Sequence, residues 1–107
     1  TLADLLSLNQ RMITIEQIQK VTAAYYKIRV SDILSSKRDK KNTLPRHVAM
    51  ALCKELTNNS LPTIGDMFGG RDHTTVLHAN KKVIKLRKED SQVAQDINNI
   101  IHILNNG

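Results

Sequence analysis

The residues best placed to do chemistry in this chain follow the glycine pair Gly69-Gly70, which is typical of a turn. Directly after it come five polar residues that can donate or accept hydrogen bonds: Arg71, Asp72, His73, Thr74 and Thr75. Asp72 is a good N-cap, because its short carboxylate can accept from free N–H groups in the first turn of a helix. Polar groups on a first turn could also meet base edges in the major groove of DNA, as a recognition helix does.

Two helices are expected to position these residues. The first covers 61–68, where Pro62 fits the first turn because its missing N–H is harmless there. An apolar stripe of Ile64, Met67 and Phe68 is predicted by their spacing of three and four residues, and Gly65 leaves room for another helix to approach. The second helix follows the glycine turn and is rich in lysine. Residues 61–87 therefore have the layout of a helix-turn-helix, with a turn about one residue longer than the tightest such motifs.

The rest of the chain is also predicted to be helical. Apolar residues recur three and four apart over residues 2–12, 15–27, 30–34, 45–58 and 90–105. Thr14 and Gln17 have the spacing of a capping box, Ser31 is expected to cap the short helix at 30–34, and Pro45 is expected to start the next one. Residues 35–43 lack an apolar period and are expected to form an exposed basic loop. The fold class predicted is all-α, a compact helical bundle containing a helix-turn-helix.

Composition and charge narrow the class of protein. The chain has 107 residues, which suits one domain. Its formal net charge is +6, and most of the excess lies in residues 35–47, with five basic residues and one acidic, and in residues 71–88, with six basic and one acidic. Two basic clusters around a helix-turn-helix favour a phosphate footprint over an ordinary solvated face. With three aromatic residues, the chain suits duplex DNA better than single strands, which are usually bound by stacking on aromatic rings.

Other kinds of site find little support. His73 and His78 are five residues apart and so do not converge on one face of a helix. Asp72, His73 and Thr74 have triad-like chemistry, but adjacent residues point in different directions. The single cysteine, Cys53, is expected in the core rather than in a disulfide. No metal site or catalytic activity is predicted.

No apolar run approaches the roughly 20 residues that cross a bilayer, and no secretory signal pattern opens the chain.

The run from Gly69 to Ala79, GGRDHTTVLHA, resembles the signature of the C-terminal DNA-binding domain of the bacterial replication initiator DnaA. Further segments resemble that domain in the same order: 13–20, 25–28, the basic run near Arg38, 49–52 and 61–65. The resemblance covers essentially the whole chain and implies a Trp-repressor-like helix-turn-helix. It implies that residues 1–12 are a linker helix from a preceding ATPase domain, and that residues 13–107 are the DNA-binding domain of a longer protein.

The resemblance also implies roles for individual residues. Arg38 would enter the minor groove, where a narrow A·T-rich groove attracts a guanidinium, and Pro62 would touch a thymine methyl. Base edges in the major groove would be read by Asp72, His73 and Thr74, although Asp72 could instead be only an N-cap and His73 only a surface residue. Contacts to the phosphate backbone are expected from Lys37, Lys40, Arg46, His47, Lys54, Thr57, Arg71, Thr75, His78 and Lys82. His47 stands where many relatives carry glutamine.

The partner implied is double-stranded DNA carrying DnaA boxes of the TTATCCACA type at a replication origin, in the bacterial cytoplasm and nucleoid. No cofactor is expected in this domain, because ATP and ADP would bind the preceding one. Other DnaA protomers would assemble through the other domains. Regulatory proteins and acidic phospholipids are further candidate partners, although residues 1–12 carry only one arginine and one aspartate. Two alternatives are a helix-turn-helix transcription factor with other operators, and a helical adaptor whose basic face binds an acidic protein.

Overall fold

The computed structural model describes residues 13–35 and 40–106, and within these ranges it contains helices and no strands. The helices are α2 (Ile15–Tyr25), α3 (Val30–Leu34), α4 (Lys40–Leu56), α5 (Leu61–Met67), α6 (His73–Glu89) and α7 (Ser91–Asn106). The all-α prediction is confirmed. The helix predicted at 2–12 lies outside the described residues, as do the side chains of Lys37, Arg38 and Lys40.

The start of α2 follows its sequence signals. The Thr14 hydroxyl accepts from the Gln17 N–H at 3.1 Å, and the Gln17 side chain accepts from the Thr14 N–H at 3.1 Å. This is the predicted capping box, which satisfies two N–H groups at the start of the helix. The helix ends two residues earlier than expected, at Tyr25, and Lys27 follows in the left-handed region with φ of 60°.

The region around α3 and α4 differs from the prediction in two ways. The N-cap of α3 is Arg29 and not Ser31, because the Asp32 carboxylate reaches back to accept from the Arg29 N–H at 3.1 Å. The basic loop predicted over 35–43 is wrong for residues 40–43, which belong to α4, and residues 36–39 lie outside the described residues. Pro45 therefore lies inside α4 rather than at its start. Pro45 is the sixth residue of α4 and lies beyond the first turn, so its missing N–H removes one hydrogen bond of the helix.

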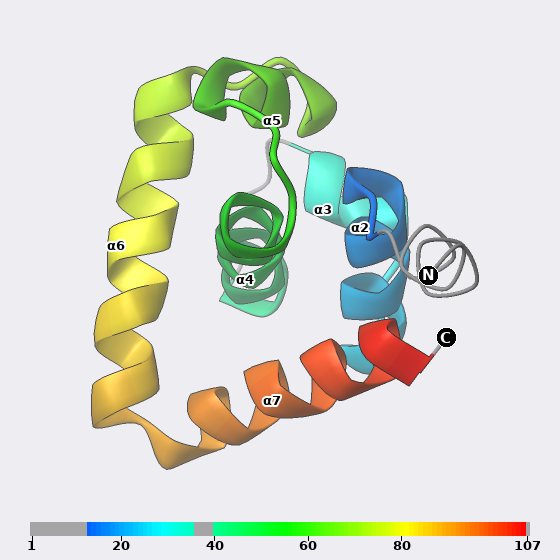
Figure 1. The fold of residues 1–107 in the computed structure, drawn as a ribbon, viewed down its shortest axis with the longest axis vertical. Helices are drawn as coiled ribbons and strands as arrows, with labels where there is room; N and C mark the ends of the chain where they lie inside the picture. The colour runs from blue at the N-terminus through cyan, green and yellow to red at the C-terminus, as the bar shows by residue number, and fades with distance from the viewer. Residues whose placement is uncertain (1–12, 36–39, 107) are drawn as a thin grey trace, which may run out of the picture.

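The centre of the molecule is α4, which α2, α3, α5 and α6 surround (Figure 1). The side chains that fill the space between them are fully buried: Ile18, Ile33, Val48, Met50, Leu52, Ile64, Phe68 and Val76. Cys53 belongs to this core, as predicted, and burial raises the pKa of its thiol to about 12. A buried thiol of this kind packs as a small apolar group.

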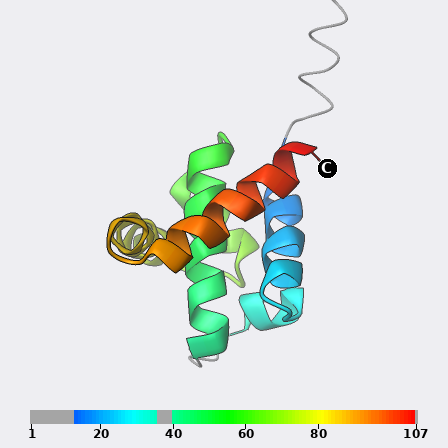
Figure 2. The ribbon, with the colours of Figure 1, turned by 90° about the horizontal axis from the view of Figure 1, so that it is seen from below.

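The last helix, α7, closes the side of the bundle opposite α5 (Figure 1) and runs from the end of α6 back to α2 (Figure 2). Its apolar stripe is buried as its period predicted, with Val93, Ile97 and Ile100 in the core. The Tyr25 hydroxyl donates to the largely buried Asp96 carboxylate at 2.8 Å and ties α2 to α7. Among the described residues, no helix is both long enough and apolar enough to cross a membrane.

Candidate nucleic-acid interface

The helix-turn-helix consists of α5, the turn at residues 68–72, and α6. Ser60 caps α5 by accepting from the Thr63 N–H, and Pro62 lies in the first turn of that helix, as predicted. Both glycines of the turn are left-handed, with φ of 80° at Gly69 and 75° at Gly70. Glycine adopts this conformation without the steric penalty that a Cβ brings, so the predicted glycine turn is confirmed.

The angle between α5 and α6 is set by a close backbone approach at Gly65. A Cβ built on this glycine would lie 2.1 Å from the Arg71 carbonyl oxygen, and the Arg71 N–H donates to the Gly65 carbonyl at 2.8 Å. The segment that approaches Gly65 is therefore the turn before α6, and not another helix as predicted. The predicted apolar stripe is also only partly correct, because Ile64 and Phe68 are fully buried whereas Met67 is 37% exposed.

The first turn of α6 presents a connected set of exposed polar groups. One oxygen of the Asp72 carboxylate accepts from the His73 N–H at 2.8 Å, which makes Asp72 the N-cap, as predicted. The other oxygen accepts from the Thr74 hydroxyl. These hydrogen bonds lower the pKa of Asp72, the largest contribution coming from Thr74. The carboxylate is therefore ionised near neutral pH, and Asp72 and Thr74 hold each other in place.

The outer face of α6 continues this polar surface along the helix. Val76, Ala79 and Val83 are buried against α4, and most of the residues on the opposite face of the helix are exposed. The predicted phosphate contacts on this helix, Thr75, His78 and Lys82, are all exposed. So are Lys81 and Lys85, which we did not single out from the sequence. Their spacing of three and seven residues from His78 is the signal that could have identified them.

Residues before the turn contribute a second edge. Pro62 is exposed at the start of α5, beside the exposed Thr63, and Lys54 is exposed near the end of α4. Thr57 is only partly exposed, and its hydroxyl is occupied within the domain, because it donates to the Cys53 carbonyl at 2.6 Å and accepts from the Asn59 side chain at 3.1 Å. Of the polar groups predicted on this edge, Lys54 is therefore the freer to meet a phosphate.

Two of the arginines predicted to contact phosphate are engaged inside the protein. Arg46 is 5% exposed, and its guanidinium donates to the carbonyls of Ile33 at 2.7 Å and Asp32 at 3.2 Å. Arg71 is partly buried and donates to three carbonyls, those of Phe68, Leu34 and Ser35. Burial lowers the pKa of both guanidinium groups. Both arginines therefore stabilise the fold through hydrogen bonds to backbone carbonyls, a role that the charge pattern did not predict.

His47 lies on α4 close to these two arginines and to the basic face of α6. Its Nδ1 atom is buried and has no hydrogen-bond partner within the described structure. Burial lowers the pKa of His47, and the nearby positive charges of Lys82, Arg46 and Arg71 lower it further. The imidazole is therefore neutral in the folded domain at neutral pH, and a phosphate beside it would favour protonation by opposing the neighbouring cations.

This environment predicts how stability depends on pH. The folded-state pKa of His47 lies below its ordinary value of 6.5, so the unfolded chain binds a proton that the folded chain does not as pH falls below 6.5. Stability should fall with decreasing pH from about 6.5 toward the lower folded-state pKa, by up to about 1.4 kcal/mol per pH unit for this one group. Urea unfolding of the chain and of His47→Gln, followed from pH 7.5 to 5.5, tests this. The variant should show a flatter pH dependence, and identical slopes would contradict the assignment.

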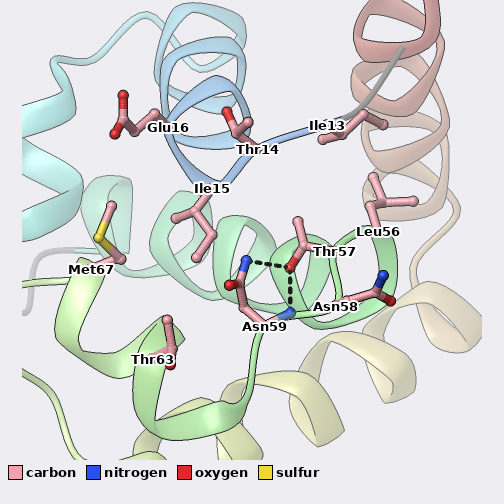
Figure 3. A pocket seen from close by; sticks show the side chains of 10 residues that line it. All are labelled: Ile13, Thr14, Ile15, Glu16, Leu56, Thr57, Asn58, Asn59, Thr63 and Met67. Atoms are coloured by element: carbon pink, nitrogen blue, oxygen red, sulfur yellow. Dashed lines mark hydrogen bonds between the residues drawn. The ribbon is translucent and has the colours of Figure 1, made fainter. Parts of the chain in front are cut away.

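A groove of about 610 Å³ lies elsewhere on the domain, between the start of α2, the end of α4 and α5 (Figure 3). Ile13, Ile15, Leu56 and Met67 supply its apolar lining, and Glu16 is the one charged residue among the described residues that line it. Among these residues, none supplies the positive charge that phosphates require. Among the described residues, no group of three or more histidine, cysteine or acidic side chains could hold a metal ion.

A helix-turn-helix with a polar first turn and a basic outer face on its second helix defines a class of DNA-binding domain. The chain matches the family described as bacterial dnaA protein helix-turn-helix over residues 15–83, which is more than half of its length. It belongs to this family, as the resemblance of the glycine-turn segment indicated. The match includes α2 to α5 and the greater part of α6, so it covers both the turn and the recognition helix. A domain of this kind binds DNA and is not itself catalytic.

Proposed function

We propose that this domain binds duplex DNA at DnaA boxes of the TTATCCACA type, and thereby selects the origin at which chromosome replication begins. The observation that carries the proposal is the first turn of α6. It places Asp72, His73 and Thr74 in an exposed position, at the end of a helix whose outer face is basic. Boxes located in promoters would allow the same binding to regulate transcription.

The chemistry of the first turn suits base edges in the major groove. A carboxylate can accept from the exocyclic amine of cytosine or adenine, and Thr74 offers both a hydroxyl and a methyl group that suits thymine. Each Asp72 oxygen already accepts within the first turn, but a carboxylate oxygen has a second lone pair for a base. The internal hydrogen bonds thus hold the reading groups in position before DNA arrives, which reduces the entropy lost on binding. Pro62 would meet a thymine methyl, and Arg38 would enter the minor groove.

The phosphate contacts are assigned to exposed groups around this turn. On α6 they are Thr75, His78 and Lys82, joined by Lys81 and Lys85 on the same helix. We also assign phosphate contacts to Lys54 and His47 on α4, and to Lys37 and Lys40 in the basic run. Thr57 would take part only by exchanging one of its internal hydrogen bonds. For Arg46 and Arg71 we propose a supporting role in place of the phosphate contact, because each guanidinium donates at least two hydrogen bonds to carbonyls of the domain.

A gel-shift titration across a salt series tests the proposal. The duplexes are a single box, the same box with one base pair changed, and a scrambled sequence of equal length. We expect the box to bind most tightly, and the single change to weaken binding by about 1–3 kcal/mol. Five to seven neutralised phosphates predict a slope of log K against log salt of about −4.5 to −6. Equal affinity for all three duplexes would contradict the proposal, and would favour an adaptor that binds an acidic protein.

A further inference from the structure

The end of the short helix α3 is held by two arginines from other parts of the chain. The last carbonyls of a helix have no partner within it, and in α3 they accept instead from side chains. Arg46, from α4, donates to the carbonyls of Asp32 and Ile33. Arg71, from the turn before α6, donates to the next two carbonyls, those of Leu34 and Ser35. Four successive carbonyls are thus bound by two guanidinium groups.

Arg71 also joins this helix end to the helix-turn-helix. The same guanidinium donates to the carbonyl of Phe68, which belongs to the turn. The two backbones lie close to each other beside it, because a Cβ built on Gly69 would be 2.7 Å from the Leu34 carbonyl oxygen. A guanidinium is suited to this position because its donors form a rigid planar fork, whereas a lysine ammonium is a single compact charge on a flexible stem.

Each of the two segments that Arg71 joins leads into a residue proposed to contact a base. Ser35 lies shortly before Arg38 in the sequence, and Arg71 immediately precedes Asp72, the N-cap of α6. We propose that Arg71 is a positioning residue, which holds the end of α3 against the turn that leads into α6. The two grooves of one box can then be read together. This inference rests on the proposed function, because it assumes that both segments contact DNA.

A direct phosphate contact by Arg71 makes a different prediction. If its charge mattered, Arg71→Lys would bind almost as well as the wild type, and Arg71→Gln would reduce the salt slope by about 0.9. A positioning role predicts that both variants lose affinity for the box about equally. It also predicts little change in their salt slopes and little change on scrambled duplex. The inference would be overturned if Arg71→Lys bound the box almost as well as the wild type while Arg71→Gln bound it more weakly and with a smaller salt slope.

A double-mutant cycle tests the positioning role itself. In the wild-type background we expect Arg38→Ala to weaken box binding about tenfold or more. In the Arg71→Lys background the same change should cost about threefold or less, because the end of α3, which precedes Arg38 in the sequence, is no longer held against the turn. Thr74→Ala is the matched control, and its effect should be the same in both backgrounds. Equal effects of Arg38→Ala in both backgrounds would overturn the inference.

Two further results distinguish a failure of this inference from a failure of the proposed function or a loss of the fold. If the wild-type chain does not distinguish the box from scrambled duplex, the proposed function fails, whatever Arg71 does. Melting followed by circular dichroism shows whether each variant is folded at the assay temperature, and the cycle is run with Arg71→Gln if Arg71→Lys is not. Unfolding of both variants would show that Arg71 supports the fold as a whole, and would overturn a specific role in positioning.

Discussion

Gly65→Ala is expected to lower the free energy of unfolding by about 3 kcal/mol or more, the upper part of the range for overpacking a well-filled site. The reason is geometric, because the added Cβ would lie 2.1 Å from the Arg71 carbonyl oxygen. That oxygen belongs to the backbone and cannot move without shifting the turn. Relief of the overlap would also disturb the hydrogen bond from the Arg71 N–H to the Gly65 carbonyl.

Gly70→Ala is the matched control for this prediction, because it makes the same chemical change in the same motif. A Cβ on Gly70 meets no atom within 4 Å, so its cost arises only from the left-handed φ of 75°. That cost is about 1–2 kcal/mol. Urea unfolding of both variants gives the comparison. A Gly65→Ala variant no less stable than Gly70→Ala would show that the close approach does not set the angle between α5 and α6.

Thr74→Ala should reduce discrimination between a DnaA box and scrambled duplex by about 1–3 kcal/mol, the contribution of one good base contact. The substitution removes the hydroxyl and the methyl that would face a base. It also removes the hydroxyl that donates to the Asp72 carboxylate, so Asp72 becomes less fixed. Affinity for scrambled duplex should change little, since sequence-independent binding comes mainly from phosphate contacts.

Lys82→Ala is the comparison for Thr74→Ala, because it changes an exposed residue two turns further along the same helix. Loss of a phosphate contact should weaken binding to box and scrambled duplex about equally, and reduce the salt slope by about 0.9. Fluorescence anisotropy on both duplexes measures the two effects. If the variants behaved alike on both duplexes, the division of α6 into a first turn that contacts bases and an outer face that binds phosphates would be wrong.

The helix-turn-helix could be predicted from sequence because its signals are local. The glycine pair, Asp72 at the N-cap and Pro62 in a first turn each depend on the conformation of one or two residues, and each lies where expected. Met67 shows the limit of periodicity. Its spacing matches that of buried Ile64 and Phe68, but it lies at the edge of a groove and is 37% exposed.

The roles of Arg46 and Arg71 could not be predicted from charge. Both lie in or next to basic clusters, and such clusters normally face solvent or phosphate. Apart from the Phe68 carbonyl, their acceptors are carbonyls of residues 32–35, between 13 and 37 positions away in sequence. No local pattern reports such a contact, because it depends on how α3 packs against α4 and the turn. The beginning of α4 at Lys40 was also missed, because a proline favours the first turn of a helix, whereas Pro45 is the sixth residue of α4.

The central claim is that the first turn of α6 is the part of this chain that enters the major groove. Titration of the ¹⁵N-labelled chain with a duplex carrying one box, followed by amide chemical shifts, tests it most directly. We predict the largest shifts at Asp72, His73, Thr74 and Thr75, with smaller shifts along the basic face of α6 and almost none in α7. Largest shifts in α7, or along the groove between α2 and α5, with the first turn of α6 unchanged, would contradict it.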